Sequence, residues 1–399
     1  MNILYIVQQS IYNNKGQWLS ADSNPMMIMG IIDQLLEKTD WKFDVMISPI
    51  EMFADITDYR QLLVRPSERV RFIPRPGPVS AFTNRYHFDV ELFTEVFKAK
   101  HYDVVINNII ELTRNIKTLL WEMKKPVKIV VGNYWIDCPM VGEEKIDLRV
   151  SYDWRQIDGA QCADLVTFTC QSTKQIFLIN CAHRMNFAVS TEIGRRATIW
   201  DFGFSAYELD LYAPVPERNP LKRIVFPNRL SMINYTHHEE FIKAVNDLYE
   251  KRQDFEVVFT NPSQKVSWEW LKANVKPLKV ISEKTLNREE YINLLWSSDI
   301  SVSLYTNERY GGCANVEAIY CGTYPVMTNY GEYIRRARPD FQKVELDLSN
   351  LEAVLDNALN MCQKEPVEER IHRNNLVYNQ SSYEKVSQTV IEDIRELVV

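Results

Sequence analysis

Short apolar runs alternate along the chain with longer segments in which apolar residues recur every three or four positions. In the first half of the chain the runs have the length of strands: Ile3 to Val7, Phe43 to Ile47, Val104 to Ile106 and Val127 to Val131. The segments between them have helical spacing, as in the stretch from Pro25 that carries Met26, Met29, Ile32 and Leu35 on one face. Such alternation predicts an α/β protein built on parallel sheets.

The alternation continues in the second half, with predicted strands at Arg223 to Phe226, Phe255 to Phe259, Val280-Ile281, Asp299 to Leu304 and Tyr324 to Met327. The passage from Arg65 to Pro78 is rich in proline and is predicted to be irregular. A polar loop with Gly311 and Gly312 precedes a helix that is expected to start near Asn315. Helix N-termini and glycine-rich turns that follow parallel strands hold phosphate groups, so this stretch predicts a nucleotide site.

A proline-rich break divides the chain. Three prolines and no periodicity mark Tyr212 to Leu221, and 399 residues are enough for two or three domains. We therefore expect a first domain over 1–213, a linker over 214–221, a second domain over 222–380 and a final amphipathic helix over 381–399.

An ordered set of residues in the second domain resembles a known family. Glu308, the pair Tyr310-Gly311, the pair Glu317-Ala318 and a closing Cys-Gly-Thr-Tyr-Pro-Val from Cys321 follow one another. The set resembles the donor half of retaining glycosyltransferases of the GT-B fold, the large glycogen-synthase-like and sucrose-synthase-like class. The resemblance implies two Rossmann-like domains facing across a cleft, with the final helix crossing back to the first domain. Each of these features, taken alone, would be explained equally well by an ordinary Rossmann-like half with a glycine turn and a surface glutamate. Their order along the chain favours the glycosyltransferase.

The resemblance also implies roles for residues. Glu317 matches the glutamate that binds the ribose hydroxyls of a nucleotide sugar, and the residues expected to bind the donor are Gly16, Arg229, Glu308, Tyr310, Gly311, Gly312, Asn315 and Glu317. Two departures stand out: eight residues separate Glu308 from Glu317 where the family has seven, and Tyr324 precedes Pro325. The first leaves the role of Glu308 open. The second also occurs in relatives that glycosylate a modified nucleobase in tRNA.

Arg229 follows the first strand of the second domain, where the family has an arginine and then a lysine that hold the pyrophosphate. A guanidinium suits this role because it is always charged and can bind two phosphate oxygens. The lysine is missing here, so either a neutral donor replaces it or the cation comes from elsewhere, with Lys265 and Arg309 as candidates. The neighbouring His237-His238 has no third ligand in range, so a helix start is favoured there over a metal site.

The first domain supplies the acceptor residues that the resemblance implies. Asp137 falls on the acidic position of a loop that faces the cleft, although an Asp close before a proline also forms turns. Tyr134 and Trp135 beside it are candidates for a wall that stacks on a sugar or base, or for caps of the core. Trp18 and Gly16 lie in the first strand-to-helix loop, which is an ordinary solvent loop in the alternative interpretation.

The family's reaction needs no protein nucleophile, because a leaving phosphate oxygen helps to take the acceptor proton. Asp137 and Arg229 are therefore the expected catalytic residues, and neither a metal ion nor a cofactor beyond the nucleotide sugar is required. Three other functions stay open at this point: a nucleotide-sugar epimerase, a phosphorylase, and a non-catalytic nucleotide-sugar binding protein.

Composition and charge limit the class of protein, its partners and its location in the cell. Apolar residues make up 46% and charged residues 25%, which is ordinary for a soluble protein, and a net charge of -7 argues against bulk electrostatic coating of nucleic acid. The seven cysteines form no C-x-x-C motif, the N-terminus has no basic region, and no window approaches 18 apolar residues. We expect a cytoplasmic protein without membrane insertion, whose acceptor is either a glycan or a modified base in DNA or tRNA. The sequence leaves the oligomeric state undetermined.

Overall fold

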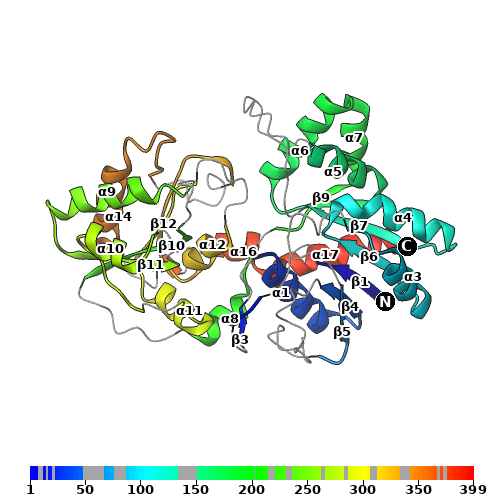
Figure 1. The fold of residues 1–399 in the computed structure, drawn as a ribbon. Helices are drawn as coiled ribbons and strands as arrows, with labels where there is room; N and C mark the ends of the chain where they lie inside the picture. Colours follow the sequence, from blue (N-terminus) through cyan, green and yellow to red (C-terminus); the bar gives the residue numbers. More distant parts are fainter. Residues whose placement is uncertain are drawn as a thin grey trace. The chain divides into compact units, whose positions relative to one another are not determined.

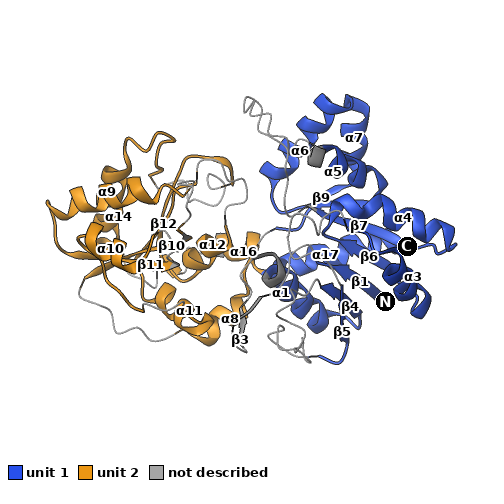
Figure 2. Ribbon diagram, viewed as in Figure 1, with its two compact units in different colours: residues 1–202, 383–399 blue, residues 203–382 orange. Residues whose placement is uncertain are grey.

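The structure is a computed structural model in which two compact units are described. The described residues are 1–7, 12–14, 17–19, 23–47, 67–75, 87–133, 151–201, 203–213, 221–230, 236–261, 266–282, 286–305, 312–332, 342–365, 369–371 and 375–399. Unit 1 comprises Met1–Phe202 and Tyr383–Val399, and unit 2 comprises Gly203–Ser382 (Figure 2). Residues 203–213, expected at the end of the first domain, group with unit 2, and 214–220 of the expected linker lie outside the described residues.

Unit 1 is built on a parallel sheet of seven strands in the order β5-β4-β1-β6-β7-β8-β9 (Figure 1). Its strands are β1 (Asn2–Ile6), β4 (Lys42–Ile47), β5 (Val70–Pro74), β6 (Val104–Asn107), β7 (Lys128–Asn133), β8 (Leu165–Phe168) and β9 (Ala197–Ile199). Its helices are α1 (Ser23–Lys38), α3 (Val90–Ala99), α4 (Thr113–Glu122), α5 (Ser151–Cys162), α6 (Gln171–Arg184), α7 (Phe187–Arg195) and α17 (Tyr383–Val398), with a 3-10 turn η3 (Ile110–Leu112). The apolar runs form strands because a parallel sheet is covered on both faces.

Two segments of unit 1 differ from the sequence-based expectation. Val70–Pro74, within the passage expected to be irregular, forms β5, which pairs in parallel with β4. As an edge strand it is buried on fewer sides, so its charged Arg71 and terminal Pro74 are tolerated and mask the strand pattern. Trp18, expected in a loop, lies in β3 (Gln17–Leu19), which pairs antiparallel with β2 (Tyr12–Asn14).

The final helix packs in unit 1 against α1. The Lys38 ammonium donates to the carbonyl of Glu384 and to Ser387 Oγ, the latter at 2.7 Å. A Cβ placed on Gly30 of α1 would lie 2.3 Å from the ring of Tyr383. A glycine at this position therefore permits the close approach of the two helices.

Unit 2 is built on a parallel sheet of four strands in the order β11-β10-β12-β13. The strands are β10 (Lys222–Arg229), β11 (Phe255–Asn261), β12 (Ile300–Ser303) and β13 (Tyr324–Met327). The helices are α8 (Ala206–Leu211), α9 (His238–Tyr249), α10 (Trp268–Asn274), α11 (Arg288–Trp296), α12 (Cys313–Tyr320), α14 (Leu351–Lys364) and α16 (Asn375–Ser381). Every residue of β12 and β13 is buried, as expected for strands that helices cover on both faces.

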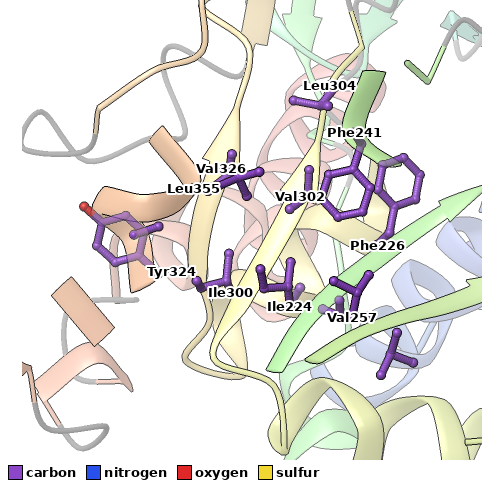
Figure 3. Close-up of a cluster of buried hydrophobic side chains, with 14 of the residues drawn as sticks. Ile224, Phe226, Phe241, Val257, Ile300, Val302, Leu304, Tyr324, Val326 and Leu355 are labelled. Atoms are coloured by element: carbon purple, nitrogen blue, oxygen red, sulfur yellow. The ribbon is translucent and has the colours of Figure 1, made fainter. Parts of the chain in front are cut away.

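In the core of unit 2, the rings of Phe226 and Phe241 lie beside aliphatic side chains of the strands (Figure 3). The ring centroid of Phe226 lies 5.0 Å from that of Phe241 and 5.6 Å from that of Phe259, within the range of favourable aromatic pairs. Tyr324, the residue inserted before Pro325, belongs to the same core and is 3% exposed. The core thus fixes the strands whose ends carry the candidate site.

One expectation about unit 2 was wrong and another was confirmed. Val280-Ile281 forms no strand, and the side chain of Ile281 is 43% exposed. The chain pairs with β11 two residues earlier, where Leu278 forms an isolated parallel bridge with Val257. α12 starts at Cys313, directly after Gly312, which agrees with the expected start near Asn315.

Candidate functional site

The start of α12 combines a glycine with a helix N-terminus after a buried strand. Gly312 precedes α12 with φ 46° and ψ 131°, a conformation that residues with a side chain rarely adopt. The unpaired amides and the dipole at a helix N-terminus favour a negatively charged group nearby. This arrangement is suited to binding a phosphate.

Glu317 lies one turn into α12 and is held by an arginine of a neighbouring helix. Arg288, the first residue of α11, donates from Nη2 to Glu317 Oε1 at 2.6 Å. The same guanidinium makes two bonds to Glu208 of α8, from Nε at 3.0 Å and from Nη2 at 2.8 Å. The side chains of Glu317 and Glu208 are 9% and 14% exposed and that of Arg288 is 33% exposed, so one cation is shared by two largely buried carboxylates.

The charges of this cluster alter the pKa values of their neighbours. Burial alone would lower the pKa of Arg288, but Glu317 and Glu208 outweigh it and raise the pKa well above its usual value. Burial, together with the charge of Glu317, raises the pKa of the Tyr291 hydroxyl and of the Cys321 thiol well above their usual values. Both groups therefore stay neutral beside the carboxylate.

Tyr291 contributes a buried hydrogen-bonding group without a partner. Its ring lies under the Arg288 guanidinium, with 5.6 Å between Cζ and the ring centroid. Its hydroxyl forms no hydrogen bond within the part of the chain that the structure describes. A buried unpaired hydroxyl costs about 1–3 kcal/mol, which a polar ligand would recover.

Asn315 is fully buried on the same helix. Its amide nitrogen lies 2.9 Å from Met327 Sδ of β13, and its Oδ1 accepts no bond from the described residues. Gly312, Asn315 and Glu317 are therefore the expected donor residues that the structure brings together on one helix.

The other expected site residues lie wholly or partly outside the described residues. Arg229 ends β10, where the register with β11 shifts, and Trp18 lies in β3; the side chains of both are outside the described part. Gly16, Tyr134, Trp135, Asp137, Glu308, Tyr310 and Gly311 lie outside it altogether. Their roles stay predictions.

Three residues of the cluster, Arg288, Tyr291 and Glu208, were missed by the sequence-based prediction. Arg288 follows Asn287, which with Glu290 forms a capping box, so the helix start was recognisable. Arg288 pairs with residues that lie 29 and 80 positions away, and Tyr291 packs below it. No pattern in the neighbouring sequence predicts these contacts.

Neither a metal site nor a membrane-spanning helix is present among the described residues. They contain no group of three or more His, Cys, Asp or Glu side chains placed to hold a metal ion. Within the same residues, no helix combines the length and the apolar character that crossing a membrane requires.

Comparison with known proteins places the fold. No family model matches the chain. A curated relative, the tRNA-queuosine alpha-mannosyltransferase of Drosophila melanogaster, is 25% identical over 209 residues, which cover 45% of this chain and 51% of that protein. The match thus spans about half the length of the relative.

Solved structures match over nearly the whole chain. The α,α-trehalose-phosphate synthase (UDP-forming) of Burkholderia vietnamiensis is 12% identical, with a TM-score of 0.67 and 100% and 97% of the two chains covered. Anabaena HepE in complex with UDP is 13% identical, with a TM-score of 0.66 and 99% and 100% covered. At these identities the likeness concerns the fold, and it confirms the resemblance at that level: the chain has the two-sheet α/β architecture of the GT-B glycosyltransferases.

Proposed function

We propose that the protein is a glycosyltransferase that moves a sugar from a nucleotide-sugar donor to an acceptor hydroxyl with retention of configuration. The observation that carries the proposal is the start of α12, where Gly312 and the buried carboxylate of Glu317 lie at the end of a parallel sheet in a GT-B fold. The UDP bound in Anabaena HepE supports a nucleotide donor.

In this proposal unit 2 binds the donor. Glu317 accepts hydrogen bonds from the ribose hydroxyls, while Arg229 and the amides around Gly311 and Gly312 bind the diphosphate. Each well-placed donor to the leaving group would stabilise the transition state by about 2–4 kcal/mol. Glu308, Tyr310 and Asn315 complete the proposed donor site in unit 2, and Gly16 of the first domain is proposed to contribute to it as well.

Unit 1 would meet the acceptor. We propose that Asp137 orients the acceptor hydroxyl and that Trp18, Tyr134 and Trp135 stack on the acceptor. The partial relative acts on queuosine in tRNA, and the tyrosine before Pro325 agrees with that direction, so a modified base of tRNA is the proposed acceptor.

Donor binding is tested first. Thermal-shift measurements with UDP, GDP and ADP, alone and linked to glucose or mannose, should identify one nucleotide that raises the melting temperature. Binding of none of them would contradict the proposal.

Transfer is tested with a labelled nucleotide sugar and tRNA that either carries or lacks queuosine, with glycans and hydroxymethylated DNA as further acceptors. Label should enter only the queuosine-containing tRNA. An isomerised sugar or a sugar phosphate as the product would instead indicate the epimerase or phosphorylase.

The phosphate role of Arg229 is tested by Arg229→Ala, which should lower turnover by a factor of roughly 100 or more at an unchanged melting temperature. Arg252→Ala is the matched control. Arg252 pairs with Asp254, just before β11, and thus lies at the opposite end of the strands. Near-normal turnover of the Arg229 variant would remove this assignment.

A further inference from the structure

The carboxylate of Glu317 is held by one strong bond, in which Oε1 accepts from Arg288 Nη2 at 2.6 Å. The Tyr291 hydroxyl lies close enough to interact with the same carboxylate, but it forms no well-aligned hydrogen bond with any described residue. A carboxylate that is held firmly through one oxygen keeps capacity at the other to bind a ligand hydroxyl.

We propose that Arg288 is a positioning residue, anchored by Glu208, which fixes the Glu317 carboxylate for recognition of the ribose hydroxyls of the donor. The inference rests on the proposed function and adds to it two residues that act through Glu317.

The geometry of the guanidinium supports this role. Nε and Nη2 of Arg288 engage both oxygens of Glu208, which fixes the plane of the fork, and Nη2 also reaches Glu317. A planar bidentate pair of this kind restricts orientation as well as distance. The bond to Glu317 therefore has a defined direction.

The segment that carries Glu208 is also bonded to α12 at both ends of that helix. Cys313 Sγ, at the start of α12, donates to the carbonyl of Gly203 at 3.3 Å, and the Tyr320 hydroxyl, at its end, donates to both oxygens of Asp210 at 3.1 Å. Glu208 lies between Gly203 and Asp210, as Glu317 lies between Cys313 and Tyr320. Three connections thus join residues 203–210 to α12, and the one through Arg288 is the middle one.

The local charge balance also favours a positioning role. Two carboxylates share one cation, so the cluster keeps a net negative charge, and the Tyr291 hydroxyl beside it is a hydrogen-bond donor. For stability alone, one carboxylate would suffice to pair Arg288. The second carboxylate and the unpaired hydroxyl supply an acceptor and a donor for a ligand diol.

The test measures discrimination by the ribose site. The dissociation constants of UDP and GDP, each compared with its 2′,3′-dideoxy form, are measured by calorimetry for the wild type, Arg288→Met and Arg288→Lys. In the wild type we expect loss of the ribose hydroxyls to weaken binding by a factor of roughly ten or more, because hydrogen bonds to a charged group are lost. In Arg288→Met this factor should fall towards one.

Arg252→Met is the matched control, since Arg252 also pairs with two carboxylates, Asp254 at 2.6 Å and Asp356 at 2.8 Å. It should keep the wild-type discrimination. A merely structural role of Arg288 would weaken both nucleotide forms equally and leave the ratio unchanged, which would overturn the inference. A loss of discrimination in Arg252→Met as large as in Arg288→Met would also overturn it.

Arg288→Lys serves if the methionine variant does not fold. Lysine keeps the charge but cannot form the fork, so the ratio should fall below that of the wild type, and an unchanged ratio would overturn the inference. A wild type that binds UDP or GDP but does not discriminate against the dideoxy form removes the inference and leaves the donor proposal intact. A wild type that binds neither nucleotide removes both.

Discussion

Asp44 in unit 1 and Glu317 in unit 2 are both buried carboxylates, yet their surroundings differ. Asp44 is 2% exposed and accepts from Arg71 Nε at 3.2 Å, from Arg71 Nη2 at 2.5 Å, from Lys100 Nζ at 3.2 Å and from the Tyr102 hydroxyl. The side chain of Glu317 is 9% exposed and accepts one strong bond, from Arg288.

The difference separates a carboxylate that stabilises the fold from one that is available to a ligand. All the hydrogen-bonding capacity around Asp44 is used by protein donors. Burial alone would raise the pKa of Asp44, but the bonds from Arg71, Tyr102 and Lys100 outweigh it and lower the pKa. Around Glu317, the carboxylate accepts one strong bond, from Arg288, and the nearby Tyr291 hydroxyl forms no well-aligned hydrogen bond with the described residues. Burial of a charge is therefore no guide to its role until its bonds are counted.

The largest expected effect on stability is that of Asp44→Ala. It would leave the Tyr102 hydroxyl buried without an acceptor and two cations without a counter-charge, so unfolding in urea should show a loss of about 3 kcal/mol. Nucleotide affinity should not change. A loss below about 1 kcal/mol would contradict the assignment of Asp44 as a structural carboxylate.

Acidification should remove the same contribution gradually. Because the folded pKa of Asp44 lies below its usual value of 3.8, its stabilisation is present above pH 3.8 and is lost as the pH falls through the folded pKa. The difference in unfolding free energy between wild type and Asp44→Asn, measured in urea from pH 6 to pH 3, should be constant above about pH 5 and shrink below about pH 4. A difference that grows on acidification would have the wrong sign.

Glu317→Gln should give the opposite pattern to Asp44→Ala. Arg288 keeps Glu208 as its partner, so the free energy of unfolding should change by no more than about 1 kcal/mol. The affinity for the donor nucleotide should fall by a factor of roughly ten, since a charged acceptor of the ribose hydroxyls is lost. Calorimetry and urea unfolding of the same sample separate the two effects, and unchanged affinity would contradict the ribose role.

The smallest effects compare two tyrosines. Tyr102→Phe removes a bond to Asp44 and should cost about 1 kcal/mol in urea unfolding. Tyr291→Phe removes a hydroxyl without a partner and should leave the free energy of unfolding unchanged or slightly raised. Equal losses in the two variants would show that the surroundings of Glu317 are as saturated as those of Asp44.

Local patterns were sufficient for the buried strands and for part of the site. β1, β4, β12 and β13 follow from continuous apolar runs because both of their faces are covered. The residues at the start of α12 follow from the order of glycines and glutamates that resembles a known family. Patterns failed at β5, an edge strand, and at Val280-Ile281, because β11 pairs with the chain two residues earlier, at Leu278.

By itself, the sequence determined the α/β class, the resemblance to GT-B glycosyltransferases and the place of Gly312 and Glu317 in a candidate donor site. Those features depend on periodicity and on residues close together in the chain. Only the tertiary structure decided that Arg288 joins Glu317 to Glu208 and that α8 groups with unit 2. Contacts between residues 29 and 80 positions apart depend on how the helices pack on the sheet, and no local interaction along the chain specifies them.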